Sequence, residues 1–381
     1  MTTVTIAANG MTGRMGRNQH LQRSLLAIRA QGGVALADGR RIWPELILIG
    51  RDADRVRRLA EENGIERWSV DRDGVLSDPA VDVYFDATAT ASRADGVRAA
   101  IGAGKAVYCE KPLAPTADEA AELAKLAAAA GVKSGIVADK LFLPGLRKLR
   151  RAVDSGFFGR ILSVRCDFGY WVFEGQIEPS QRPSWNYRSE DGGGIVLDMF
   201  PHWQYVLEDL FGAIRSVLCH TVVHVPERID EHGAPYTPTA DDAAYALFEL
   251  DGGVVASFTS SWVTRVWRDE LVEFHVDGTA GSAVAGLRSC HLQPRAATPR
   301  PTWNPDIPNP IDFRSTWVDA PAIEPDENGF KLQWEAFLRH VVADEPFPHT
   351  LTQGARGALI ADLALRSSSE RRWIDVPAGD A

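Results

Sequence analysis

A glycine-rich turn near the N-terminus constrains the fold of this chain more than any other feature. The apolar run TVTIAAN leads into NGMTGRMG, and apolar residues at helical spacing follow. Gly10, Gly13 and Gly16 are spaced G-x-x-G-x-x-G, which departs from the usual G-x-G-x-x-G. A strand, a glycine turn and a helix in this order still favour a dinucleotide site. Glycine lets the backbone approach a pyrophosphate, and a helix N-terminus attracts negative charge.

The side chains of this turn offer further contacts to a phosphate. Thr12 brings a hydroxyl donor and Arg14 a positive charge. A tight turn without a ligand is the alternative for a lone glycine triplet, and the strand and helix around it favour the cofactor. The predicted cofactor-binding residues here are Gly10, Thr12, Gly13, Arg14 and Met15.

The pattern of apolar and polar residues changes once along the chain. Over the first 140 residues, short buried runs such as ELILIG and VDVYFD alternate with helical patterns, which is typical of βαβ units and a parallel sheet. After Pro144, segments such as SVLCHTVVHV and VEFHVDG alternate apolar and polar residues, as antiparallel strands with one solvated face do. We therefore expect an α/β fold with three parts: a Rossmann NAD(P)-binding domain over 1–140, an α+β domain over 141–340, and a helical tail over 341–381 that packs back toward the first domain.

The residue that meets the cofactor ribose follows the second strand of such a domain. The spacing rule of about 20 residues leads to Asp38. The stronger strand is ELILIG, so Gln31–Pro44 is interpreted as an insertion, and Arg51 and Asp52 follow the strand. Asp52 favours NAD through the ribose hydroxyls, whereas Arg51 favours NADP through a 2′-phosphate. The residues favour NAD and leave NADP open.

Composition and charge exclude several classes of protein. The 381 residues carry a net charge of −10, so we expect no general affinity for nucleic acid or for an anionic membrane. No apolar run approaches the roughly 20 residues of a membrane span, and no signal peptide is recognised. The four cysteines lack C-x-x-C spacing and the histidines lack metal-ligand spacing. A cytoplasmic protein without a metal site is predicted.

The segment YCEKPLA places opposite charges where a strand leaves the core. Ligands of open parallel sheets bind beyond the carboxyl ends of the strands, so Glu110 and Lys111 are expected to face the nicotinamide. A lysine there donates to a substrate oxygen and stabilises an alkoxide as hydride leaves. Pro112 restricts the backbone beside it.

A second constellation lies in GGGIVLDMFPH. Asp198 and His202 are four residues apart on a predicted helix and share one face. A histidine beside a carboxylate is held in one tautomer and made more basic, so His202 is suited to remove a hydroxyl proton.

Together, EKPLA, the glycine triplet before Asp198 and His202, and the two-domain layout resemble the Gfo/Idh/MocA family of sugar and inositol oxidoreductases along essentially the whole chain. The resemblance implies an N-terminal Rossmann domain and a C-terminal α+β domain with a large, mostly antiparallel open sheet. It also implies Lys111 and His202 as the catalytic pair, with Asp198 orienting the substrate or the histidine. The open face of the sheet often mediates oligomers in this family, so a homodimer or homotetramer is expected.

Two stretches depart from the family pattern. The turn after the fourth predicted strand is ATATASR, with Thr88, Thr90 and Arg93 where the family often has Thr-Pro-Asn followed by His. The stretch after the sixth strand is ADKLFLP, with Asp139 and Lys140 where the family often has an Asn-x-Arg-like sequence. Both stretches are expected near the nicotinamide and the substrate, so they affect substrate identity. Thr88, Thr90 and Glu110 complete the predicted cofactor-binding set.

Aromatic, Arg and Gln residues crowd the segment that begins at Tyr170 and leads into the catalytic helix. Aromatic rings pack against the apolar faces of sugars, and Arg holds hydroxyls or an anionic group. A well-packed loop with surface arginines is the alternative. The predicted substrate-binding residues are Lys140, Arg182, Trp185, Tyr187 and Arg188, and their cationic members suit a carboxylate- or sulfonate-bearing sugar.

Three functions fit these residues. The preferred one is a redox-neutral, NAD-dependent glycosidase that oxidises carbon 3, eliminates the aglycone, adds water and returns the hydride. The insertion and the altered turn resemble the family branch that contains NAD-dependent sulfoquinovosidases. The alternative is a net NAD(P)-dependent sugar or inositol dehydrogenase, and the remaining hypothesis is a non-catalytic nucleotide sensor.

Overall fold

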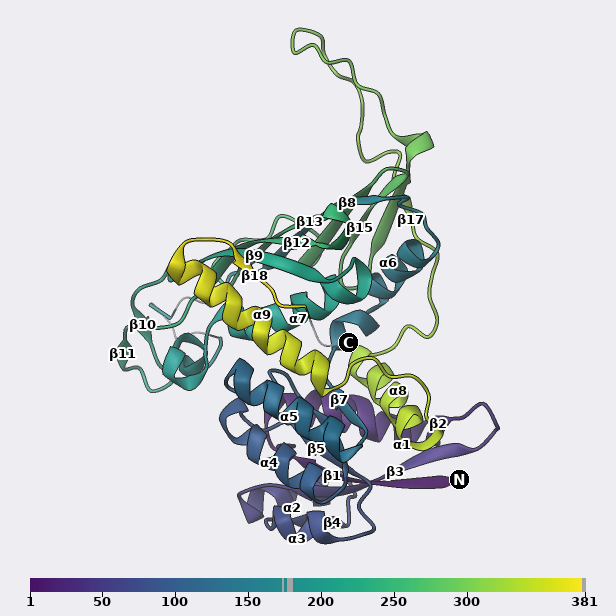
Figure 1. Cartoon of the computed structure of the whole chain (residues 1–381), viewed down its shortest axis with the longest axis vertical. Helices are drawn as coiled ribbons and strands as arrows, with labels where there is room; N and C mark the ends of the chain where they lie inside the picture. Colours follow the sequence, from purple (N-terminus) through teal and green to yellow (C-terminus); the bar gives the residue numbers. More distant parts are fainter. Residues whose placement is uncertain (173–174, 177–180, 379–381) are drawn as a thin grey trace. The chain divides into compact units, whose positions relative to one another are not determined.

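The computed structural model describes residues 1–172, 175–176 and 181–378 (Figure 1). The chain divides into two compact units. The first consists of Met1–Phe142, Phe200–Tyr205 and Glu327–Asp362. The second consists of Leu143–Met199, Val206–Asp326 and Leu363–Ala381. The first unit thus includes a short segment of the predicted catalytic helix and most of two helices from the end of the chain.

A seven-stranded sheet forms the centre of the first unit. Its strands are β1 (Thr2–Asn9), β2 (Val34–Ala35), β3 (Arg41–Ile49), β4 (Arg67–Ser69), β5 (Val83–Asp86), β6 (Ala106–Cys109) and β7 (Ser134–Ile136). The order is β3-β1-β5-β6-β7, with β2 and β4 both paired to β3. All pairs are parallel except β2–β3. The carboxyl ends of the parallel strands therefore meet at one edge, where open sheets of this kind bind ligands.

Helices cover both faces of this sheet. Successive residues of β1 alternate between two apolar clusters, with Ile6 in one and Ala7 in the other. The first cluster includes residues of η1, α1, α2 and α8, and the second includes residues of α3, α4, α5 and the start of α9. The bounds are η1 (Gly16–Leu26), α1 (Ala27–Ala30), α2 (Ala53–Glu62), α3 (Arg72–Ser77), α4 (Thr90–Gly102), α5 (Ala117–Ala130), η2 (Asp139–Phe142), α8 (Gly329–Ala343) and α9 (Leu351–Glu370). The predicted Rossmann domain with a parallel sheet is confirmed.

The segment interpreted as an insertion is a β-hairpin, and that interpretation was wrong in its second half. Strand β3 begins at Arg41, and β2 pairs with it through Val34 and Ala35. Pro44 lies inside β3, opposite Val4 of β1. On its other side, β3 pairs with β2 only at Arg41 and Ile42, and with β4 only from Ile47 onward. This locally unpaired edge tolerates a residue without an N–H group, so proline does not end the strand.

The second unit is built on a nine-stranded sheet in the order β17-β16-β15-β14-β8-β13-β12-β9-β18. Every pair is antiparallel except β8–β13. The strands are β8 (Ile161–Gly169), β9 (Ile214–Val222), β12 (Ala243–Leu250), β13 (Val255–Ser261), β14 (Val272–Gly278), β15 (Gly281–Ala285), β16 (Cys290–Pro294), β17 (Val318–Asp319) and β18 (Ile374–Asp375). The predicted large, mostly antiparallel sheet is confirmed.

One face of this sheet is buried and the other is open. Phe248, Phe258 and Phe274 point inward and are buried, whereas Tyr245 and Leu247 of β12 are exposed. Helix α6 (Pro144–Asp154) belongs to the second unit and packs against β15 and β16 (Figure 1). The two ends of α7 (Ile195–Leu210) also belong to this unit, whereas Phe200–Tyr205 in its middle belong to the first. The smaller elements are η3 (Ser184–Tyr187), η4 (Ser189–Asp191), β10 (Arg228–Ile229), β11 (Pro235–Tyr236), η5 (Asp251–Gly253) and η6 (Arg295–Ala297).

Among the helices of the described residues, none has the length and apolar character needed to cross a membrane.

Candidate active site

The three glycines of the first turn have different roles. Gly10 has a φ of 82°, and a Cβ atom on it would lie 2.5 Å from the carbonyl carbon of Ala87. A Cβ on Gly16 would lie 2.4 Å from the oxygen of Gly10. Glycine at position 10 therefore lets the turn pack against the backbone of Ala87 and Thr88, and glycine at position 16 lets the start of the helix pack against the turn itself. A Cβ on Gly13 would meet only ordinary contact at 3.4 Å, so the fold itself does not require glycine there.

The other predicted cofactor residues of the first turn lie where β1 gives way to η1. Thr12 and Met15 are half-buried and Arg14 is exposed. The N–H of Arg17 donates to the carbonyl of Gly13 at 2.8 Å, so the turn joins the helix directly. This arrangement leaves the turn at the carboxyl edge of the sheet, as dinucleotide binding requires.

Arg51 and Asp52 follow the carboxyl end of β3, and both are exposed. The carboxylate of Asp52 also caps α2, because it accepts a hydrogen bond from the N–H of Arg55 at 3.0 Å. Asp38 instead lies in the β2–β3 turn, where it pairs with Arg40 at 2.7 Å. The spacing rule therefore pointed to a hairpin turn, because this hairpin lengthens the chain between η1 and the end of β3.

Thr88 lies in the connection between β5 and α4, and Thr90 is the first residue of α4. The N–H and the hydroxyl of Thr88 both donate to Asp86, at 2.8 and 2.6 Å. Asp86 is fully buried and ends β5, and it was not among the predicted site residues. The acidic residue in VYFDATAT was the only sequence signal for it. Its contacts order the turn that follows β5.

Glu110 is buried and supports the backbone of the lysine beside it. One carboxylate oxygen lies 2.8 Å from Nε2 of His20, and the other accepts from the N–H of Lys111 at 3.1 Å. The indole N–H of Trp334 donates to Nδ1 of His20 at 3.0 Å. Since Nδ1 accepts, we assign the proton to Nε2, which donates to Glu110. Glu110 was predicted to contact the cofactor, and the structure places its carboxylate in this internal network.

Burial and hydrogen bonding have opposite effects on the pKa of Glu110. Burial acts to raise the pKa of this carboxyl, while the hydrogen bond from His20 and the charge of Lys111 lower it. The net pKa is below its ordinary value, so Glu110 stays ionised and acts as a fixed acceptor.

His202 lies in a buried polar cluster of the first unit. Its Nδ1 atom lies 2.6 Å from the hydroxyl of Tyr205, and that hydroxyl donates to Asp139 at 3.4 Å. A phenol has one proton, so donation to Asp139 makes its oxygen the acceptor for an Nδ1–H. We therefore assign the Nδ1–H tautomer, in which Nε2 is the basic nitrogen.

The carboxylate of Asp139 also receives a hydrogen bond from Nζ of Lys140 at 2.6 Å. Burial and the charge of Asp139 raise the pKa of Tyr205 well above its ordinary value, so the phenol keeps its proton. The charge of Glu110 contributes to the same shift, and Glu110, Lys111 and this cluster all belong to the first unit. Tyr205 was missed from the sequence, although its i+3 spacing from His202 puts the two side chains on one helix face.

Asp198 belongs to the second unit and pairs with a predicted substrate residue. Its carboxylate accepts from Arg182 at 2.8 Å, and the Arg182 guanidinium lies 4.2 Å from the centre of the Trp262 ring. Arg188 similarly lies 4.8 Å from the Tyr236 ring, and Trp185 is half exposed. Residues 173–174 and 177–180 of the predicted aromatic-rich segment lie outside the described residues.

Tyr187 differs from the other predicted substrate residues because its side chain is fully buried. Its ring packs edge-on against Trp262 at 5.5 Å, and the Arg228 guanidinium lies 3.9 Å from the ring centre. Arg228 is itself buried in an ion pair with Asp242 at 2.9 Å. The ring of Tyr187 fills the core of the second unit, so it presents no surface to a sugar.

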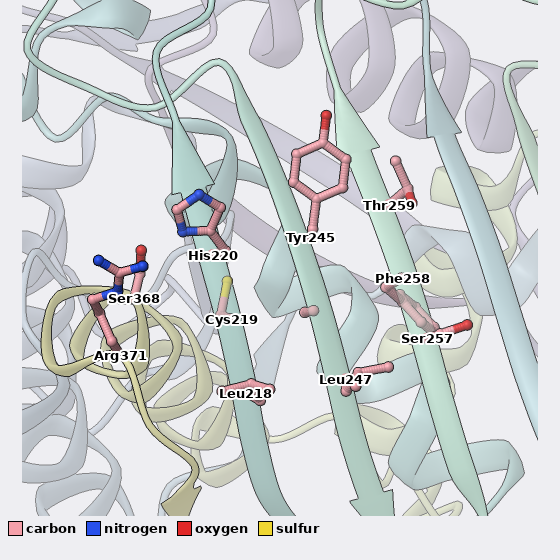
Figure 2. Close-up of a pocket in the computed structure, with 11 residues that line it drawn as sticks. Leu218, Cys219, His220, Tyr245, Leu247, Ser257, Phe258, Thr259, Ser368 and Arg371 are labelled. Carbon is pink, nitrogen blue, oxygen red and sulfur yellow. The ribbon is translucent and has the colours of Figure 1, made fainter.

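A shallow hollow lies on the outer face of the nine-stranded sheet (Figure 2). Strand residues His220, Tyr245 and Thr259 line it, together with Arg371 after the end of α9. None of the predicted site residues, all of which the structure describes, belongs to its lining. The candidate active site is therefore distinct from this hollow. The described part of the chain also contains no cluster of three His, Cys, Asp or Glu residues suited to a metal ion.

A Rossmann sheet with a glycine turn, joined to an α+β unit with an open antiparallel sheet, defines the class of two-domain dinucleotide-dependent oxidoreductases. Residues 27–137 match the model of the oxidoreductase family with an NAD-binding Rossmann fold, and residues 146–284 match the GFO/IDH/MocA C-terminal domain. The chain is 55% identical to a D-xylose dehydrogenase of Paenarthrobacter nicotinovorans over 98% of its own length and 97% of that protein. The chain belongs to the Gfo/Idh/MocA family, and its cofactor is NAD.

More distant relatives agree with this assignment. A levoglucosan dehydrogenase of Pseudarthrobacter phenanthrenivorans is 24% identical over 85% of this chain and 86% of that protein. A solved levoglucosan dehydrogenase in complex with NADH and L-sorbose has a TM-score of 0.81 at 20% identity, covering 99% of this chain and all of the other, and this likeness concerns the fold. The protein is thus an NAD-dependent sugar oxidoreductase. These relatives are named as dehydrogenases, so the comparisons support the alternative function better than the preferred glycosidase.

Proposed function

We propose that this protein is a net NAD-dependent dehydrogenase of an aldose, with D-xylose as the first candidate substrate. The observation that carries the proposal is the 55% identity to a D-xylose dehydrogenase along nearly the whole of both chains. The cluster around His202 supports it, because the base of a dehydrogenase must be held in one tautomer when the substrate arrives.

In this proposal, His202 and Lys111 share the chemistry at the hydroxyl that is oxidised. Nε2 of His202 takes the hydroxyl proton, while Nδ1 remains bonded to Tyr205. Nζ of Lys111 donates to the same oxygen and stabilises the negative charge that develops there. Bound NAD would supply the acceptor for the hydride that leaves the carbon bearing this hydroxyl. The residues proposed to hold it are Gly10, Thr12, Gly13, Arg14, Met15, Arg51, Asp52, Thr88 and Thr90.

The residues proposed to contact the rest of the sugar are Lys140, Arg182, Asp198, Trp185 and Arg188. Arg182 and Asp198 already hold each other, so they offer a fixed donor and acceptor to neighbouring hydroxyl groups. Trp185 offers an exposed ring, and Arg188 further donors. The proposal is completed by a cytoplasmic homodimer or homotetramer and by the division into a Rossmann domain at 1–140, an α+β domain at 141–340 and a helical tail at 341–381.

The test separates the two carbohydrate chemistries in one assay. The purified protein is incubated with NAD and either free aldoses or nitrophenyl glycosides, including the sulfoquinovoside, while NADH absorbance and aglycone release are followed together. We expect NADH to accumulate with D-xylose and no aglycone to appear. NAD-dependent aglycone release without NADH would overturn the proposal in favour of the glycosidase. Absence of turnover with every substrate would contradict both.

A matched pair of lysine variants tests the assignment of Lys111. Lys111→Met is expected to lower kcat by roughly 10²–10⁴-fold, because it removes the donor to the reacting oxygen. Lys125→Met changes an exposed lysine on α5 and serves as the control. If Lys111→Met turns over as fast as Lys125→Met, Lys111 takes no part in the chemistry. If neither variant nor the wild type reduces NAD, the sensor hypothesis is supported.

A further inference from the structure

Arg93 on α4 is an almost fully buried arginine that contacts two backbone carbonyl groups from different loops. Its side chain is 4% exposed. Nη2 donates to the carbonyl oxygen of Thr88 at 2.6 Å, and Nη1 donates to the carbonyl oxygen of Pro112. Thr88 belongs to the turn after β5, and Pro112 directly follows Lys111. One guanidinium therefore joins the predicted nicotinamide turn to the segment of the predicted catalytic lysine.

The charge of Arg93 is balanced by Asp86, which is fully buried at the end of β5. Nε of Arg93 lies 3.7 Å from Oδ1 of Asp86, and that carboxylate also accepts from Tyr84 at 2.6 Å. Asn9, at the end of β1, donates to the hydroxyl of Tyr84 at 2.9 Å. The network thus spans the ends of neighbouring strands. Desolvating both charges is costly, and a buried ion pair is weak evidence for added stability. We therefore consider how Arg93 holds the two loops in place, and not how much its ion pair adds to stability.

Lys111 is fixed through both of its neighbours in the chain. On one side, Glu110 is held by His20 at 2.8 Å and accepts the N–H of Lys111 itself. On the other side, the carbonyl of Pro112 is held by Arg93. The backbone that carries the lysine has little freedom to shift. Displacements of about 1 Å at a reacting group cost roughly 10²-fold in rate, so such restraint bears directly on catalysis.

We propose that Arg93 is a positioning residue for Lys111, which it holds through the Pro112 carbonyl in the place needed for hydride transfer. The inference rests on the proposed function, because it takes Lys111 as the donor to the oxidised hydroxyl. Arg93 itself does not touch substrate. Its forked donors reach two carbonyl groups at once, and the single ammonium of a lysine cannot reproduce this geometry.

The experiment compares Arg93→Lys and Arg93→Met with Arg98→Met. Arg98 lies on the same helix with its side chain 37% exposed, and it pairs with Glu119 and Glu122 at the surface. NAD affinity is measured from the change in tryptophan fluorescence, and sugar oxidation is measured with ordinary and deuterated sugar. In Arg93→Lys we expect NAD affinity within about 3-fold of wild type, kcat lower by roughly 10–100-fold, and a larger deuterium isotope effect. Arg98→Met should match wild type.

Hydrogen exchange gives a readout that does not depend on turnover. Backbone amides of the peptide that spans 108–114 should exchange faster in Arg93→Lys than in wild type, while those of β1 should not change.

The outcomes separate this inference from the proposed function. If the wild-type protein oxidises no sugar but the 108–114 amides still exchange faster in Arg93→Lys, the proposed function is overturned and the role of Arg93 in holding the loop is not. Oxidation by wild type and by a folded Arg93→Lys protein at equal rates, with equal isotope effects, would overturn the inference. If Arg93→Met does not fold, Arg93→Lys carries the test alone. Loss of NAD affinity as large as the loss of kcat would assign Arg93 to cofactor binding instead.

Discussion

The Nδ1 atom of His202 lies 2.6 Å from the hydroxyl oxygen of Tyr205, three residues further along α7. Asp139 lies behind this pair and accepts a hydrogen bond from the phenol hydroxyl. The contact fixes which imidazole nitrogen carries a proton, and thereby which nitrogen is left to act as a base. The orienting partner of the histidine within the first unit is therefore a tyrosine backed by an aspartate.

Tyr205→Phe should weaken catalysis by removing this partner while leaving the ring in place. A hydrogen bond to a group that becomes charged is worth about 1.5–3 kcal/mol, so kcat/KM should fall roughly 10–100-fold. His202→Gln should cost more, roughly 10²–10⁴-fold, because it removes the base itself. Steady-state kinetics with D-xylose measure both. Tyr245→Phe, on the exposed face of β12, is the matched control and should leave kcat/KM unchanged. A Tyr205→Phe enzyme as fast as wild type would refute the orienting role.

Gly10 and Gly13 should respond differently to the same substitution. Gly10→Ala places a methyl group 2.5 Å from the Ala87 backbone at a φ of 82°, so we expect it to cost about 1–3 kcal/mol of folding free energy or more. Gly13→Ala meets only ordinary contact within the protein, so it should fold normally and lose NAD affinity by crowding the pyrophosphate. Urea unfolding and NAD titration separate the two effects. Normal NAD binding by folded Gly13→Ala would show that the cofactor does not approach this residue.

Asp52 has two predicted tasks that two substitutions distinguish. Asp52→Asn keeps a side-chain acceptor for the helix cap, so its stability should change little while its preference for NAD over NADP falls. Asp52→Ala should lose that preference and also about 1 kcal/mol of stability with the cap. Asp71 caps α3 through Gly74 at 2.9 Å, so Asp71→Ala is the control that loses a cap without a change in cofactor preference. Unaltered preference in Asp52→Asn would place the ribose elsewhere.

Asp241 should make stability depend on pH. Burial raises the pKa of this carboxyl from 3.8 to about 6, against the lowering effect of the hydrogen bond from the N–H of Val196. A carboxyl with a raised pKa in the folded state binds its proton more tightly there. Its contribution is thus fully present below about pH 4 and is lost as pH rises through about 6, a loss of about 3 kcal/mol.

Asp241→Asn should flatten this dependence between pH 4.5 and 7.5, as measured by urea midpoints at each pH. Asp362→Asn, at an exposed position on α9, should keep the wild-type slope. Identical slopes in wild type and Asp241→Asn would show that this carboxyl titrates near its ordinary pKa.

The sequence by itself determined the fold class and the family. Buried runs alternating with helical patterns require a parallel sheet, and the alternating runs after Pro144 require antiparallel strands, because hydrophobic periodicity follows directly from the geometry of each element. The glycine turn and the EKP segment were recognised for the same reason, since each is a local backbone requirement. The sequence also pointed to Arg51 and Asp52 over Asp38, although it did not reveal that β3 continues through Pro44.

Only the tertiary structure decided which side chains meet. His20, Glu110 and Trp334 come from three distant parts of the chain, and the Pro112 carbonyl that Arg93 holds belongs to a different loop from Arg93. The burial of Tyr187 likewise depends on Trp262 and Arg228. No local pattern encodes these contacts, because each depends on how elements that are far apart in sequence pack together. Periodicity therefore located the candidate site at the strand ends, and packing determined which groups within it are positioned, paired or enclosed.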